Sequence, residues 1–284
     1  MRDVTTGSGD LVGDALALGP LIAEHADDAE HSRRLALPTV RALAEVDLMR
    51  MCVPVDYGGP AADPQTMVRA IEAVAIADGA AGWCAMIAST TSSMAAFLPT
   101  ETAREIYGAR GAITGGVFAP NGTGQATVVD GGRPGFAVTG RWPWGSGTQH
   151  CSWILGGVNC DDGTFRLCWF PQHAVTFHDT WHSSGMRGSG SLDFSVTDEL
   201  VPADRTMQPG VTRPVVDTPL AHFPNFCLLA AGVAAVGLGV ARHALDELIA
   251  LAADKRPQFS SRTLARTGYT QVEGFGGLYE DAAG

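Results

Sequence analysis

The chain has 284 residues, of which 45% are hydrophobic, and carries a formal net charge of −11 at pH 7. This length and apolar content allow one large core or two to three small ones, and they exclude a disordered chain. The negative charge argues against binding to nucleic acid, because no basic face is available to displace the counterions of phosphates.

The first 110 residues carry the signals of a helical region. Apolar side chains recur near every 3.6 positions from Leu11 onward, and Asp63-Pro64 pairs an N-cap acid with a proline in the first helical turn. The Arg33-Arg34 pair is interpreted as part of a solvated helix face. The expected helices cover residues 11–28, 38–46, 64–78, 80–87 and 100–107.

Residues 113–195 instead predict a small sheet, because short aromatic and β-branched segments alternate with Gly, Asp and Pro. The expected strands cover residues 136–139, 153–158, 166–170 and 192–196. Two stretches among them have the composition of a binding site: residues 140–147 (GRWPWGSG) and 181–191 (WHSSGMRGSGS). In the second, a glycine turn would let Arg187 and Ser189 face a ligand or a neighbouring chain.

The stretch 140–147 suits a planar ligand with polar edges. Its glycines let the backbone approach a ring, the Trp144 indole provides an apolar face, and the Ser146 hydroxyl can bond a ring nitrogen. A flavin needs these three features together. The alternative is that Trp142, Trp144 and Trp153 fill the core of the sheet and that the glycines are turns.

After Val201-Pro202, a proline-rich connection leads to an apolar helix that is expected from Phe226 to about Asp254. Its uncharged run stops at Arg242, short of the roughly 20 residues that cross a membrane, so a buried bundle helix is predicted. Glycines between positions 268 and 277 would break any further long helix. A lone helix with a broad apolar surface predicts self-association.

The six cysteines form no C-x-x-C pair and have no histidine at metal-ligand spacing, so reduced thiols and no metal site are expected. The N-terminus lacks the apolar core of an export signal, which predicts a cytoplasmic protein. Neither the nucleophile elbow of a hydrolase nor a phosphate-binding Gly-x-x-x-x-Gly-Lys loop occurs in the sequence.

Separated segments of the chain resemble one protein family in their order and spacing. These segments are residues 53–59 (VPVDYGG), 119–124 (APNGTG), 140–153 (GRWPWGSGTQHCSW) and 185–191 (GMRGSGS). They resemble the acyl-CoA dehydrogenase superfamily, most closely its flavin-dependent monooxygenases, the oxygenase components of two-component aromatic hydroxylases. The resemblance implies an α+β fold with an N-terminal helical domain (1–112), a small central β-barrel-like domain (113–215) and an incomplete C-terminal helical bundle (216–284).

The resemblance also implies catalytic and flavin-facing residues. Trp144 falls beside the flavin ring, and Ser146 falls where a hydroxyl meets ring nitrogen N5 and, in the monooxygenases, the oxygen adduct of the reduced flavin. Ser146 is therefore the first catalytic candidate. His150, one turn later, is the second, because a neutral imidazole can orient a phenol or relay a proton. An ordinary half-exposed histidine is the alternative.

Further cofactor and substrate contacts follow from the same resemblance. Phe118, Ala119 and Pro120 fall at a strand end whose backbone would face the pyrimidine side of the ring. Trp83 and Met86 lie on a helix that would open toward the substrate, so both are expected to line its pocket. Core packing of a Trp and a Met at i and i+3 is the alternative.

The implied function is an oxidoreductase, a monooxygenase that takes reduced FMN or FAD from a separate flavin reductase and hydroxylates an aromatic or polyketide-like small molecule with O2. One alternative is an FAD-dependent acyl-CoA dehydrogenase, which needs a carboxylate base, whereas Asn225 stands where one subgroup has its glutamate. The other is a non-catalytic, shortened member that acts as a binding or partner subunit. A homo-oligomer is expected. The substrate, the flavin and the general base are left open.

Overall fold

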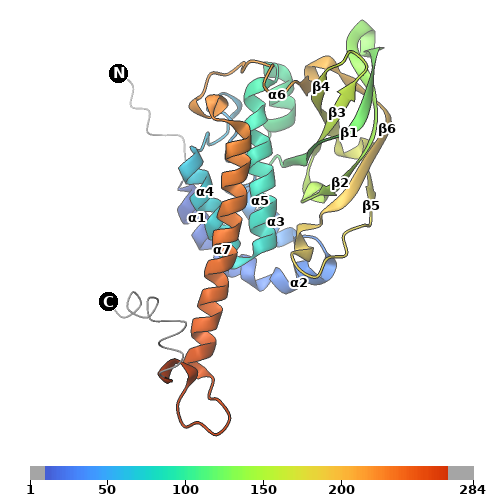
Figure 1. Cartoon of the computed structure of the whole chain (residues 1–284). Coiled ribbons are helices and arrows are strands. Elements are labelled where there is room, and N and C mark those ends of the chain that lie inside the picture. The colour runs from blue at the N-terminus through green and yellow to red at the C-terminus, as the bar shows by residue number, and fades with distance from the viewer. Residues whose placement is uncertain (1–9, 268–284) are drawn as a thin grey trace, which may run out of the picture. The chain divides into compact units, whose positions relative to one another are not determined.

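The computed structural model describes residues 10–267 (Figure 1). The chain divides into two compact units, residues 1–239 and 240–284, and the first holds every residue of the predicted site. The prediction that glycines between 268 and 277 break a further helix lies outside the described residues. The three predicted domains, bounded at residues 112 and 215, stay a prediction.

The N-terminal region is helical, as predicted. The helices before the first strand are α1 (Leu11–Glu24), α2 (Ala26–Ser32), α3 (Leu37–Glu45), α4 (Pro64–Ala77), α5 (Gly79–Ser92) and α6 (Thr100–Tyr107). The Asp63 side chain accepts hydrogen bonds from the backbone N–H groups of Gln65 and Thr66, which confirms the predicted start of α4. Asp78 caps α5 in the same way.

The single helix predicted over residues 11–28 is interrupted. His25 has φ −102° and ψ 4°, outside helical geometry, so α1 ends before it and α2 begins after it. The ring nitrogen Nδ1 of His25 lies 2.9 Å from the carbonyl oxygen of Leu21 and can donate to it. Because the last carbonyls of a helix lack partners within the helix, this bond stabilises the break. The prediction of one continuous helix is therefore wrong.

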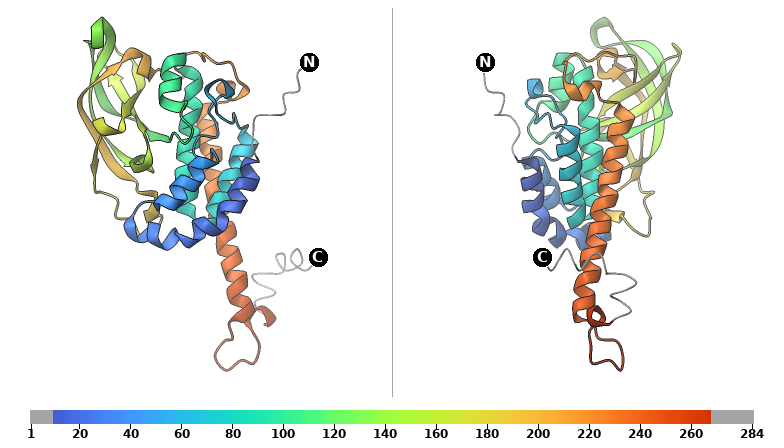
Figure 2. Two further views of the ribbon diagram at one scale, coloured as in Figure 1. Left: turned by 180° about the vertical axis from the view of Figure 1, so that it is seen from behind. Right: turned by 60° about the vertical axis from the view of Figure 1, so that its left-hand side comes forward.

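Helix α5 lies between α4 and the sheet (Figures 1 and 2). On one side it packs against α4, where a Cβ atom at Gly82 would come within 2.5 Å of Ala75. On the other side it contacts the first strand of the sheet. A residue with a side chain at position 82 would prevent this close approach of the two helices. With α4 on one side and the sheet on the other, α5 is buried on nearly every face.

A seven-stranded sheet follows the helices in the described part of the chain. Its strands are β1 (Thr114–Val129), β2 (Arg133–Gly145), β3 (Trp153–Cys160), β4 (Phe165–Pro171), β5 (Thr176–His178), β6 (Leu192–Pro202) and β7 (Thr206–Met207). The order is β5-β6-β2-β1-β3-β4-β7, with β1 and β3 parallel and the other pairs antiparallel. The four expected strands lie inside β2, β3, β4 and β6. Composition alone did not predict β1, which is rich in glycine and polar residues.

The buried indole of Trp142 organises the centre of this sheet. Its ring lies 5.2 Å from that of Phe194 and 5.4 Å from that of Phe170, between centroids, and its Nε1 donates to the carbonyl of Gly157 at 2.9 Å. The ring fills the space above glycines of three strands, Gly122, Gly140 and Gly156. For Trp142, core packing is therefore the correct interpretation.

Helix α7 (Asn225–Asp254) is the predicted long apolar helix, and it ends before Arg256-Pro257 as expected. The uncharged run counted from the sequence stops at Arg242, whereas the helix continues past it. Among the described residues it is the one helix long and apolar enough to cross a membrane, judged by length and composition only. The core helix of a soluble protein passes the same test.

Within the first unit, α7 buries one face and exposes the other. Leu228, Ala235 and Val236 are buried, and Gly232 lies against Met86 of α5. On the opposite face the large apolar side chains Phe226, Val233 and Leu238 remain 76%, 45% and 56% exposed. The sequence predicted a buried bundle helix. In the structure, this part of the helix is buried on one face only.

The contact between Gly156 and Trp142 predicts a measurable loss of stability. A methyl group at position 156 would lie 2.7 Å from the Trp142 ring and 3.0 Å from that of Phe170. We expect Gly156→Ala to lower the free energy of unfolding by about 1–3 kcal/mol, measured by urea denaturation, because overpacking forces side chains off their rotamers. Gly185→Ala is the control, since no atom lies within 4 Å of a Cβ there. Equal loss in both variants would contradict this account of the core.

Candidate functional site

The end of β2 departs from regular strand geometry at Trp144. The pairing of β2 with β6 shifts register between Trp142 and Gly145, and Trp144 has a left-handed backbone with φ 63°. Its side chain is 71% exposed. A left-handed conformation costs a bulky L-residue about 1–2 kcal/mol, and such strain is concentrated at functional sites. Trp144 is therefore a candidate ligand contact on conformational grounds as well.

Trp144 and Ser146 line one cavity of about 360 Å³. The remaining lining residues come from the start of α5 and from the segment 181–191: Trp83, Trp181, Met186, Ser189 and Ser191. This volume lies in the usual range of small-molecule sites. Flat indole walls together with hydroxyl groups are what a planar ring with polar edges requires. The residues present thus fit the isoalloxazine ring of a flavin.

Hydrogen bonds connect the polar groups of this cavity. The indole Nε1 of Trp83 donates to Ser146 Oγ at 2.9 Å, and Ser146 Oγ lies 2.7 Å from Ser191 Oγ. Ser191 Oγ in turn lies 2.8 Å from Ser189 Oγ. All three serines are buried. Ser189 was expected to face a ligand, but sequence reasoning missed Ser191, whose only signal was its place at the end of a glycine-serine run.

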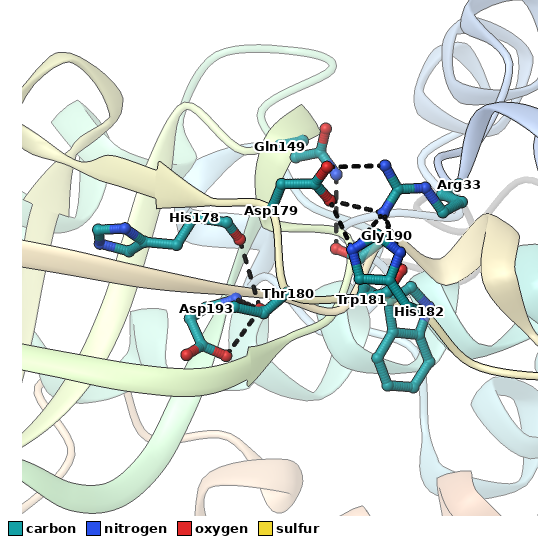
Figure 3. Close-up of polar contacts among 9 residues, drawn as sticks. All are labelled: Arg33, Gln149, His178, Asp179, Thr180, Trp181, His182, Gly190 and Asp193. Atoms are coloured by element: carbon teal, nitrogen blue, oxygen red, sulfur yellow. Dashed lines mark hydrogen bonds and ion pairs between the residues drawn. The ribbon is translucent and has the colours of Figure 1, made fainter.

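Arg33, which follows α2, binds the segment that carries Asp179 and Trp181 (Figure 3). Arg33, at the C-terminal end of α2, donates to both carboxylate oxygens of Asp179, at 2.5 and 2.8 Å, and to the carbonyl of Trp181 at 3.0 Å. The hydrogen bonds from Arg33 lower the pKa of Asp179. Glu30 accepts a hydrogen bond from the backbone N–H of Arg187 at 2.9 Å. The Arg33 side chain is 24% exposed and binds a segment 146 residues away, so it connects α2 to that segment in addition to facing solvent.

The three predicted strand-end residues lie elsewhere. Phe118 is half-buried and lines a second cavity of about 320 Å³, whereas Ala119 and Pro120 are exposed on β1. Phenylalanines dominate the wall of this second cavity: Phe97, Phe118, Phe165, Phe223 and Phe226. These three residues lie within β1, where its pairing with β3 shifts register, and not at a strand end as predicted. The structure does not bring them together with Trp144 and Ser146 around one cavity. Contact of these residues with a flavin stays a prediction.

The two predicted substrate residues have different surroundings. Trp83 lines the cavity and is bonded to Ser146. Met86 is only 1% exposed, packs against Gly232 of α7 and does not line either cavity. A substrate contact of Trp83 stays a prediction, and its place in the cavity wall is consistent with it. Met86 has the position of a core residue.

His150 is half-buried and does not line either cavity. Burial, with a smaller contribution from the positive charge of Arg34, lowers the pKa of His150 to about 4. The imidazole is therefore neutral at neutral pH, the form in which it can accept a proton. Its catalytic role stays a prediction. No group of three or more His, Cys, Asp or Glu side chains that could hold a metal ion occurs within residues 10–267.

The lowered pKa of His150 predicts how stability depends on pH. Because this pKa is about 4 in the folded chain and 6.5 in the reference state, the unfolded chain binds more protons between these values. The contribution of His150 to stability is therefore lost as pH falls from 6.5 toward 4. Over this pH range we expect the free energy of unfolding, measured by urea denaturation, to fall by about 1–3 kcal/mol less in His150→Gln than in the parent. One pKa unit corresponds to about 1.4 kcal/mol. If the free energy of unfolding depended on pH equally in the parent and in His150→Gln, the lowered pKa of His150 would be contradicted.

Comparison with known proteins places this geometry in a family. Residues 18–110 match the family model for the acyl-CoA dehydrogenase N-terminal domain. The chain is 30% identical over 279 residues to an indole-3-acetate monooxygenase of Pseudomonas putida, which covers 91% of this chain and 70% of the relative. It is 33% identical over 196 residues to the flavin-dependent monooxygenase oxygenase subunit HsaA of Rhodococcus jostii, over 67% of this chain and 50% of the relative.

A solved structure shows the same likeness. XiaF from Streptomyces sp., in complex with FADH2 and glycerol, superimposes with a TM-score of 0.80 and 28% identity over 89% of this chain and 66% of that one. The chain thus spans between 50% and 70% of the length of these relatives. The predicted α+β fold, with N-terminal helices, a central sheet and one C-terminal helix, is confirmed. The chain belongs to the acyl-CoA dehydrogenase superfamily, in the branch of the flavin-dependent monooxygenases.

Proposed function

We propose that this chain is the oxygenase component of a flavin-dependent monooxygenase that hydroxylates an aromatic small molecule. The observation that carries the proposal is that the strained Trp144 and the buried Ser146 line one ring-sized cavity. The names of the relatives support it, since they are monooxygenases and one solved structure contains FADH2. In the overall reaction, one atom of O2 enters the substrate as a hydroxyl group and the other leaves as water.

Reduced FMN or FAD would supply the two electrons of this reaction when bound. The indoles of Trp144 and Trp181 would provide apolar faces for the ring, and the hydroxyl of Ser146 would hydrogen-bond its polar edge. Fixed hydrogen-bond donors in a cavity with little water stabilise developing charge more strongly than solvent does. Trp83 keeps the Ser146 hydroxyl in place from the side of α5.

The reduced flavin would come from a separate reductase. HsaA is named an oxygenase subunit, and a relative from Rhizobium sp. is named the oxygenase component of an FADH2-dependent resorcinol hydroxylase. Such names describe one part of a system with a second component. We therefore propose a flavin reductase as the partner, and a cytoplasmic location in which the two proteins meet.

The second cavity, about 320 Å³ with its wall of phenylalanines, is proposed to bind the aromatic substrate. Asn225, the first residue of α7, lines it. No aspartate or glutamate lines either cavity among the described residues. Removal of the α-proton of a thioester needs such a base, so this wall favours a monooxygenase over an acyl-CoA dehydrogenase.

Self-association is also proposed. The face of α7 that carries Phe226, Val233 and Leu238 is apolar and exposed, and such patches are typical of protein contacts. A homo-oligomer would cover them.

The reaction itself can be tested with the purified chain. Photoreduced FMN or FAD is mixed with the protein, 18O2 and indole-3-acetate or resorcinol, and mass spectrometry measures 18O in the product. We expect one labelled oxygen per product molecule and at least a tenfold lower yield for Ser146→Ala, because one fixed donor is typically worth this much. Reduction of protein-bound FAD by an acyl-CoA without label incorporation would instead establish the dehydrogenase.

Because the backbone of Trp144 is strained, one substitution at this position should affect stability and flavin binding differently. We expect Trp144→Gly to keep or raise the free energy of unfolding by up to about 1 kcal/mol, because glycine tolerates a positive φ without penalty. The same variant should weaken flavin binding about tenfold in fluorescence titrations, since an aromatic face is lost. Trp144→Phe is the matched control and should retain most of the affinity. Unchanged affinity in Trp144→Gly would remove this indole from the site.

A further inference from the structure

The second cavity, at the start of α7, has a wall without charge. None of the described residues that line it is an Asp, Glu, Lys, Arg or His. The lining is apolar apart from two polar side chains, those of Ser93 and Asn225. Burial of an ionised group without a partner of opposite charge is strongly unfavourable. The wall therefore selects an uncharged ligand.

The volume of this cavity, about 320 Å³, limits the size of the ligand. An apolar cavity of roughly 150 Å³ holds one benzene ring. The second cavity has about twice that volume, which is enough for two fused rings. Its phenylalanine side chains provide the flat apolar surfaces against which aromatic rings pack.

The amide of Asn225 contributes an unpaired polar atom to this wall. Its Oδ1 is buried, and none of the described residues donates a hydrogen bond to it. With the amide nitrogen in its place, the wall would hold two unpaired N–H donors instead of one unpaired acceptor, which is less favourable. A buried acceptor without a donor costs free energy, and a ligand that donates to it removes this cost.

The other polar side chain of the wall has the same preference. Ser93 Oγ donates its hydrogen to the carbonyl oxygen of Thr90 at 2.7 Å. Because a carbonyl oxygen cannot donate, the direction of this bond is fixed, and only the lone pairs of Ser93 Oγ are left for a ligand. Ser93 directly after α5 and Asn225 at the start of α7 are thus both acceptors. The ligand that suits them carries a hydrogen-bond donor.

We propose that Asn225 determines substrate specificity by accepting a hydrogen bond from an uncharged aromatic substrate, of up to two fused rings, that carries a hydroxyl or ring N–H group. This inference rests on the proposed function for the role of the cavity as the substrate site. Resorcinol has such donors and no charge. Indole-3-acetate is an anion at neutral pH and finds no cationic partner in this wall. The chain thus takes a different class of substrate from the relative named an indole-3-acetate monooxygenase.

Three naphthalene derivatives of similar size test this assignment. 2-Naphthol carries a donor, 2-methoxynaphthalene has the same ring and oxygen without the donor, and 2-naphthoate is an anion. Each is titrated into the purified, flavin-free chain at pH 7 and followed by isothermal titration calorimetry. We expect the dissociation constant to be about fivefold to tenfold higher for 2-methoxynaphthalene than for 2-naphthol, because an unpaired buried acceptor disfavours a ligand without a donor. For 2-naphthoate it should be at least about tenfold higher.

Variants separate the hydrogen bond from packing. Asn225→Leu removes the acceptor at nearly constant volume, so the dissociation constants of 2-naphthol and 2-methoxynaphthalene should become equal within about twofold. Asn225→Asp keeps an acceptor and should retain the preference for 2-naphthol. Asn159→Leu is the matched control, because Asn159 is exposed on β3 and lines neither cavity, and it should leave the ratio unchanged. Circular dichroism confirms that each variant is folded.

The possible outcomes distinguish this inference from the proposed function, since the titrations contain no flavin. If the parent binds none of the probes, or binds 2-methoxynaphthalene or 2-naphthoate as tightly as 2-naphthol, the inference is wrong. An unchanged ratio in Asn225→Leu would also overturn it. Incorporation of 18O from O2 together with either result would leave the proposed function standing. The expected preference for 2-naphthol without any 18O incorporation would support donor recognition by Asn225 and contradict the monooxygenase.

Discussion

The site depends on a reversal of side-chain direction within β2. Residues two apart in a strand point to the same face, so Trp142 and Trp144 would both enter the core of a regular strand. Trp142 does so, stacked near Phe194 above glycines of neighbouring strands. The left-handed backbone of Trp144 turns its indole outward instead, next to the cavity that Ser146 lines. A buried indole thus anchors the strand, and a strained residue beside it presents the binding surface.

Local signals in the sequence predicted local structure well. The predicted cap at Asp63 sets the start of α4, because its carboxylate bonds backbone groups two or three residues away. Asp78 was predicted only as the end of α4, and its side chain also caps α5. The same kind of reasoning failed at His25, where a side-chain bond to the preceding turn interrupts the helix. It also failed for β1, because a glycine-rich strand between two others is stabilised by pairing with its neighbours rather than by its own composition.

Composition predicted the local part of the candidate site, and the resemblance predicted one distant part, Trp83. Trp144 and Ser146 belong to one short stretch, and sequence reasoning found both. Ser191 and Arg33 act through partners 45 and 146 residues away, so no periodicity or spacing in the sequence identifies them. The resemblance placed the backbone of Phe118 beside the same ligand, which stays a prediction, while its side chain lines a different cavity. A family alignment transfers positions along a strand without specifying which cavity each side chain lines.

The helices are consequently part of the site and not only its support. Trp83 on α5 bonds Ser146, and Arg33 and Glu30 on α2 hold the segment that carries Trp181. The cavity therefore has walls from both the helical region and the sheet, and it exists only where the two are packed together. Because protein interiors are close-packed, a small shift of α5 against β1 would move the Trp83 indole relative to Ser146. The glycine contact between α4 and α5, which fixes the depth of α5, thus contributes to the geometry of a hydroxyl group on the opposite side of that helix.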